Sequence, residues 1–158
     1  MNLRARTVLF VLVLLLASPV SADCNPKESW LNISAANKDL VFANRNFVSM
    51  ILSSNDLGSE ERLMADLVAL ANVEVTSEIT HLGVLASIYA REKNPSDRRY
   101  INDFAKVTTN VINSRTQTAV DRINSSITKL RNQSLIMQAM ALRDSLEKVR
   151  DALTECTR

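Results

Sequence analysis

Cys24 and Cys156 are the only cysteines of this 158-residue chain, and each lies close to one end of the mature form that we predict below. A pair at such positions is typical of a structural disulfide in an exported protein, because cytosolic thiols stay reduced. A bond between them would close a loop of about 130 residues, and it would destabilise the unfolded chain by about 5 kcal/mol in the chain-entropy model. We therefore predict one disulfide, Cys24–Cys156, with the choice between one chain and two left open.

His81 is the only histidine, and Glu78 precedes it by three residues, which is the Glu-x-x-His spacing of di-iron helical bundles. Such a centre needs a second histidine, so the sequence excludes it. A haem held by His81 and one methionine is a remote alternative, because a bundle can hold this group between its helices. The methionines that would serve are Met50, Met64, Met137 and Met140. We expect instead that His81 lies at the surface beside Glu78, that methionines fill gaps in the core, and that no cofactor is bound.

The remaining chemistry-bearing residues point to no reaction. A serine–histidine–acid set would have to use His81, which falls within a regular helical pattern rather than on a shaped loop. Glu74 and Glu78, four residues apart, are typical of a solvated helix face. We therefore expect a protein that is not an enzyme, with no catalytic and no metal-binding residue.

The first 22 residues have the pattern of a signal peptide. Arg4 and Arg6 precede an apolar run from Val8 to Ala17, and small residues precede the expected cleavage after Ala22. The apolar run is shorter than the roughly 20 residues that a membrane helix needs, and no second candidate span follows. We predict an exported protein that has no transmembrane segment once the leader is removed. A bacterial periplasm is the preferred location, and secretion is the alternative.

The charges of the mature chain are balanced. Without the leader, 17 basic side chains face 17 acidic ones. A nucleic-acid partner is therefore not expected, since binding to phosphates needs a clustered basic surplus. The length of residues 23–158 is that of a single domain with one core.

Composition and spacing predict an all-α fold. After the leader the chain contains only two glycines and two prolines, too few for the turns of a sheet protein. Apolar residues recur at intervals of three and four, which predicts helices over about 35–54, from 60 to the Asn94–Pro95 break, from about 97 to 130, and from 135 onward. We read Ser59 and Ser96 as helix caps, and the polar stretch 108–118 as a partly exposed or loosely packed middle. The last segment has a heptad seam, formed by Leu135, Ala139, Leu142, Leu146, Val149, Leu153 and Cys156.

Four helices also fit the cysteines. In an up-down bundle an even number of helices brings both ends of the chain to the same side, where a disulfide can join them. We therefore predict an antiparallel up-down four-helix bundle with both termini at one end, stapled by one disulfide.

The second and third predicted helices are the longest, so the hairpin between them is expected to project past the termini by about 20 Å. Arginine and tyrosine are favoured in protein interfaces, and both gather at this hairpin. The predicted partner contacts are Tyr89, Arg91, Lys93, Arg98, Arg99 and Tyr100. The alternative is that residues 25–34, with Trp30, fold over the projecting part and leave its charges merely solvated.

The function that this sequence favours is binding of another macromolecule by an exported, non-catalytic helical protein, as inhibitors, immunity proteins and chaperones do. A protein is the expected partner, and the choice between monomer and dimer stays open. The alternative is a carrier that holds a small apolar ligand in the bundle core or in a groove along residues 108–118.

Overall fold

The computed structural model describes residues 25–154, which contain four α-helices and no strand. The helices are α2 (Pro26–Ser53), α3 (Ser59–Arg91), α4 (Pro95–Ile127) and α5 (Gln133–Thr154). The all-α prediction is confirmed. The predicted signal peptide (1–22) and both cysteines lie outside the described residues, so the leader and the disulfide stay predictions.

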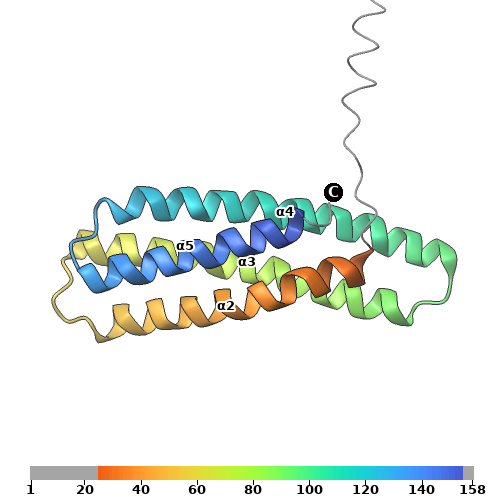
Figure 1. Cartoon of the computed structure of the whole chain (residues 1–158), viewed down its shortest axis with the longest axis horizontal. Helices are drawn as coiled ribbons and strands as arrows, with labels where there is room; N and C mark the ends of the chain where they lie inside the picture. Colours follow the sequence, from red (N-terminus) through yellow and green to blue (C-terminus); the bar gives the residue numbers. More distant parts are fainter. Residues whose placement is uncertain (1–24, 155–158) are drawn as a thin grey trace, which may run out of the picture.

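The four helices form a bundle in which consecutive helices run in opposite directions (Figure 1). Each helix packs mainly against two neighbours, in the cyclic order α2, α3, α4, α5. Helices α2 and α4 also touch across one diagonal, and α3 and α5 lie across the other. Figure 1 shows the beginning of α2 and the end of α5 toward the same end of the bundle, as the pairing of Cys24 with Cys156 requires. The α3–α4 connection lies beyond both of them.

Helix α2 begins at Pro26, nine residues before the start predicted from its apolar stripe. The cause is a capping box. The Asn25 side chain accepts hydrogen bonds from the backbone N–H groups of Lys27 and Glu28, while the Glu28 carboxylate accepts one from the N–H of Asn25. Proline is well suited to the first helical position, because its missing N–H has no partner there in any helix.

The extra turns of α2 place Trp30 against α3. Its indole ring packs on Gly83, where an added Cβ would lie 3.0 Å from Cη2 and from Cζ3 of the ring. With 28 residues in α2, 33 in α3 and 22 in α5, the α3–α4 hairpin extends past α5 by roughly 16 Å but past α2 by only about 8 Å. The 20 Å projection predicted from the sequence was therefore too large on the α2 side.

The other helix starts differ from one another in how they are capped. Asn94 caps α4 by accepting a hydrogen bond from Ser96 N–H, and Pro95 is the first helical residue, so the prediction that Ser96 is the cap was wrong. Gly58, not Ser59, is the N-cap of α3. Between α4 and α5, Glu61 Oε1 accepts from the backbone N–H groups of Arg131 and Asn132, both at 2.7 Å. This carboxylate ties the start of α3 to the α4–α5 connection.

The core is a continuous cluster of buried apolar side chains from all four helices. Every described member of the predicted α5 seam is at most 3% exposed: Leu135, Ala139, Leu142, Leu146, Val149 and Leu153. Residues 108–118 are partly exposed, as one of the two predicted alternatives has it. They are not loosely packed, because Thr108, Ile112 and Thr116 face the core and both threonine hydroxyls donate to the carbonyl four residues earlier. Such bonds satisfy a buried hydroxyl without a partner from another helix.

Candidate functional site: the outer face of the α3–α4 hairpin

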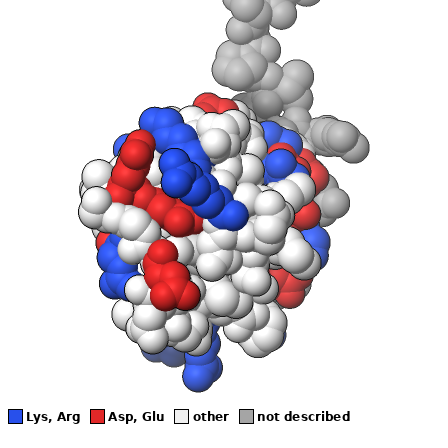
Figure 2. All heavy atoms as spheres, turned by 90° about the vertical axis from the view of Figure 1, so that its left-hand side faces the viewer, with Lys and Arg blue, Asp and Glu red and all other residues white. Residues whose placement is uncertain are grey.

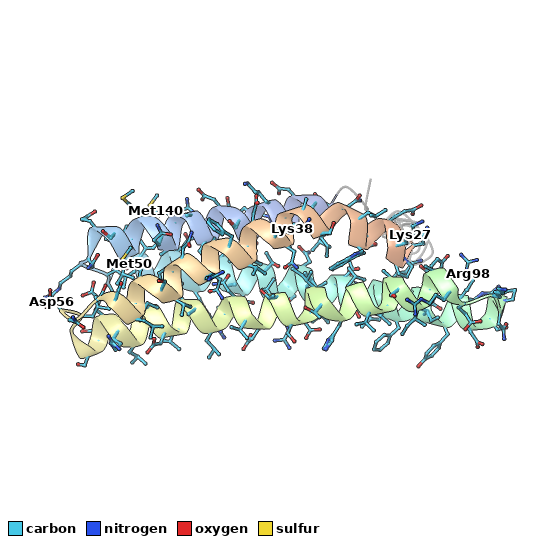
Figure 3. All side chains as sticks on the ribbon, turned by 90° about the horizontal axis from the view of Figure 1, so that it is seen from below. Lys27, Lys38, Met50, Asp56, Arg98 and Met140 are labelled. Carbon is cyan, nitrogen blue, oxygen red and sulfur yellow. The ribbon has the colours of Figure 1, made fainter. Side chains whose placement is uncertain are left out.

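Helix α3 is apolar on two sides. One side, which includes Val68, Val75 and Ile79, is buried in the core. The opposite side carries a second series of large apolar residues that no described residue covers. Figure 3 shows α3 along the lower edge of the bundle, with side chains projecting away from the other helices. A helix that is hydrophobic all round is ordinarily buried all round.

This second series continues onto α4, because Phe104 and Val84 line one hollow between the two helices. We call the combined surface the outer face. It consists of Leu63, Leu67, Leu70, Val73, Val84 and Ile88 of α3 with Phe104 and Val107 of α4, and each of these residues is 41–58% exposed. At about 90 Å² each they leave roughly 700 Å² of apolar surface open in two groups, and each group of about 360 Å² lies within the 300–600 Å² of the largest patch on a typical monomer.

The hollow between α3 and α4 has a volume of about 360 Å³ and is lined mainly by apolar atoms. Its walls are Glu78, His81, Val84, Leu85, Phe104 and Thr108. It lies at the surface of the bundle and not in the core. Of the stretch 108–118, where the sequence predicts a groove for the carrier alternative, Thr108 lines this hollow.

The six predicted contact residues lie around the α3–α4 connection, which we call the tip (residues 89–100). The Arg98 guanidinium carbon stacks 4.5 Å from the centroid of the Tyr89 ring. A shallow hollow of about 390 Å³ brings four of the six together, namely Tyr89, Lys93, Arg98 and Arg99, with Pro95 and Asn102. Arg91 and Tyr100 lie outside this hollow, and Tyr100 is 73% exposed.

The tip backbone is held in place by the side chains of Glu92 and Asn94. Glu92 Oε1 accepts hydrogen bonds of 2.8 Å from the backbone N–H groups of Lys93 and Asn94. Together with the Asn94 cap, this carboxylate satisfies backbone donors that α4 and the turn would otherwise leave unpaired. The tip therefore presents its basic and aromatic side chains on a defined turn.

Glu78 and His81 do meet on the surface, as the spacing predicts. His81 Nδ1 lies 3.3 Å from Glu78 Oε2, with the histidine side chain 65% exposed. Arg115 of α4 reaches Glu74 at 3.2 Å and Glu78 at 3.5 Å, so both carboxylates pair with a cation. Within residues 25–154 no three histidine, cysteine or acidic residues gather in a way that would hold a metal.

The methionines of the haem alternative are not brought toward His81. Met137 and Met140 are exposed on α5, which is diagonal to α3 in the bundle (Figure 3). Met50 and Met64 are half-buried and pack against the core, as expected for residues that fill gaps. His81 itself is 65% exposed and lines only the surface hollow between α3 and α4.

Charges of both signs are interspersed at the other end of the bundle, which Figure 2 shows face on. The residues there include Asp56, Glu60 and Glu61 together with Lys129 and Arg131. In the described part of the chain, no helix has the length and apolar character that crossing a membrane requires.

Comparison of the chain with protein-family models, with curated proteins and with solved structures finds no match.

Proposed function

We propose that this protein is an exported, non-catalytic helical bundle that acts by binding another protein through the outer face and the tip. One observation supports the proposal above the others. Large apolar side chains of α3 and α4 stand half exposed on one side of the molecule while the core is complete without them. An apolar surface of this extent is typical of a protein interaction site.

The tip supplies the polar complement to this apolar surface. Arg98, Arg99 and Tyr100 are exposed beside it, and arginine and tyrosine contribute disproportionately to the free energy of protein binding. The stacking of Arg98 on Tyr89 fixes the orientation of one guanidinium before any partner arrives. Less side-chain entropy is then lost on binding.

The experiment is a comparative pull-down from the compartment into which the protein is exported, with mass spectrometry of the captured proteins. The baits are the wild type, Phe104→Glu in the outer face, and the triple variant Arg98→Ala, Arg99→Ala, Tyr100→Ala. Met137→Glu is the matched control, because Met137 is an exposed apolar residue on the diagonal helix α5. We expect a protein that the wild type and the control enrich and that both site variants lose. If all four baits capture the same proteins in the same amounts, the proposal is wrong.

The apolar hollow between α3 and α4 supports one alternative, a carrier of a small apolar ligand. Val84, Leu85 and Phe104 would contact such a ligand. Native mass spectrometry of freshly purified protein separates the two functions, because a carrier retains a bound small molecule and a protein-binding bundle does not.

A further inference from the structure

We infer that the outer face pairs with the outer face of a second copy of this chain, with the two α3 helices antiparallel. The inference rests on the proposed function, since it names the protein that covers the same surface. Three features of α3 carry it: the order of its apolar and polar positions, the distribution of its charges, and the area of the face.

The apolar residues of the outer face form two groups with a polar centre between them. Leu63, Leu67, Leu70 and Val73 form the first group. Val84 and Ile88 form the second, which Phe104 and Val107 widen. Glu74, Ser77 and His81 lie between the groups on the same side of the helix, as their spacing of three and four residues from Leu70 and Val84 requires.

A two-fold axis at Ser77 brings the two groups beside each other, with Leu63 opposite Arg91 and Val73 opposite His81 of the second copy. Because the two chains run in opposite directions, Leu70 then lies opposite Val84 of the second copy, and Leu67 lies opposite its residues 87 and 88. Ser77 is small and exposed, so it allows the two helices to approach closely where they cross. A parallel pair would instead leave the wider second group of each copy without the first group to cover it.

The charges of α3 are self-complementary in the same arrangement. At its start, Glu60 and Asp66 are exposed and have no ion-pair partner among the described residues. The neighbouring Arg62 is used within the chain, donating to the carbonyls of Ile51 and Ser54 at the end of α2.

The other end of α3 is basic. Arg91 and Lys93 are exposed there and equally without an ion-pair partner in the described chain, while the nearby Glu92 carboxylate binds the turn backbone. Antiparallel pairing brings each acidic start beside a basic end, whereas parallel pairing would place like charges together.

The area is that of a dimer interface. Stable interfaces bury about 800 Å² on each partner, and the outer face alone supplies roughly 700 Å² of apolar surface per copy before its polar rim is counted. The C2 symmetry of the pair makes the same patch serve both copies, which is the commonest form of homo-oligomer.

The first test is the mass of the purified mature protein in solution, measured by sedimentation equilibrium from about 1 to about 100 µM. We expect a dimer. Leu67→Glu places two charges in each dimer and raises the dissociation constant at least about 100-fold, since each buried leucine contributes a tenfold factor or more. Met137→Glu, on α5, leaves the dimer intact.

The second test is the register. Ser77→Cys lies on the proposed axis, so two copies form a covalent dimer on mild oxidation, seen on a non-reducing gel. Ser59→Cys is the control on the same helix, because the two Ser59 positions are roughly 54 Å apart in the antiparallel pair. A Ser59→Cys cross-link, or none with Ser77→Cys, overturns the antiparallel register.

A monomer across the whole concentration range overturns the inference, and so does a dimer that Leu67→Glu leaves unchanged. Either result leaves the proposed function standing if the pull-down still enriches a protein that Phe104→Glu loses. The two failures are therefore distinguishable.

Discussion

Gly83→Ala should destabilise the protein, although alanine is the better helix former. Gly83 lies inside α3, where replacing glycine by alanine ordinarily stabilises a helix by about 1 kcal/mol. Here the new methyl group would lie 3.0 Å from Cη2 and Cζ3 and 3.2 Å from Cε3 of the Trp30 ring. Carbon atoms in ordinary contact are about 3.5–4.0 Å apart, so the ring must give way by a few tenths of an ångström.

The magnitude follows from what the ring loses. Trp30 is half-buried and packs against the core, and overpacking at such a site costs about 1–3 kcal/mol. After the helix-propensity gain is subtracted, the net destabilisation is about 1 kcal/mol. In a Trp30→Ala background the obstacle is gone, and the same substitution should stabilise by about 1 kcal/mol. The sign of the effect therefore reverses between the two backgrounds, with a coupling energy of about 2 kcal/mol.

The assay is urea unfolding followed by circular dichroism for all four proteins of the cycle. Trp30 is the only tryptophan of the chain, so its fluorescence reports directly on the ring, and emission should shift to longer wavelength in Gly83→Ala. Ser87→Ala, at an exposed position one turn further along α3, is the control, with a gain of a few tenths of a kcal/mol in both backgrounds. Equal stabilisation by Gly83→Ala with and without Trp30, at unchanged emission, would refute the packing argument.

Three further changes test the bundle. Reduction, or Cys24→Ser with Cys156→Ser, should lower the free energy of unfolding by about 5 kcal/mol if the two thiols are joined within one chain; a thiol assay that finds free cysteines in the native protein excludes this. Asn72→Leu should stabilise by about 1–2 kcal/mol, because fully buried Asn72 donates to Val68 O while its Oδ1 has no partner among the described residues; calorimetry showing a loss contradicts this. Glu61→Ala should cost about 1–3 kcal/mol and Glu60→Ala almost nothing, measured by urea unfolding.

The sequence predicts α5 well because local spacing alone decides which face of this helix is buried. A single apolar stripe with a heptad period leaves one face to bury, and every described member of that stripe is buried. The early start of α2 has an equally local cause, the sequence Asn25-Pro26-Lys27-Glu28, with an N-cap residue, a proline at the first position and a glutamate at the third. The apolar stripe alone could not reveal it, because the capping residues precede the stripe.

The outer face is a different case. Leu67 is 41% exposed, while Ala65 and Val68 beside it are buried. When apolar residues occur on both sides of a helix, their period does not select the side that faces the core. The small residues Ala65, Ala71 and Ala86 on the buried side contribute less to that pattern than the leucines on the exposed side. The direction of α3 depends on contacts with α2 and α4, which are far away in the sequence.

The outer face and the core differ in how much they contribute to the free energy of unfolding, as well as in where they lie. Leu142 and Leu146 are fully buried, so truncating either one leaves a cavity and costs about 3 kcal/mol or more, while Leu63 and Leu70 are each 54% exposed and their truncation costs the isolated chain far less. Exposed leucines of this number favour aggregation and contribute little to the stability of a monomer. If the outer face binds another protein, as proposed, substitutions on this face should remove binding while the melting temperature of the bundle stays nearly unchanged.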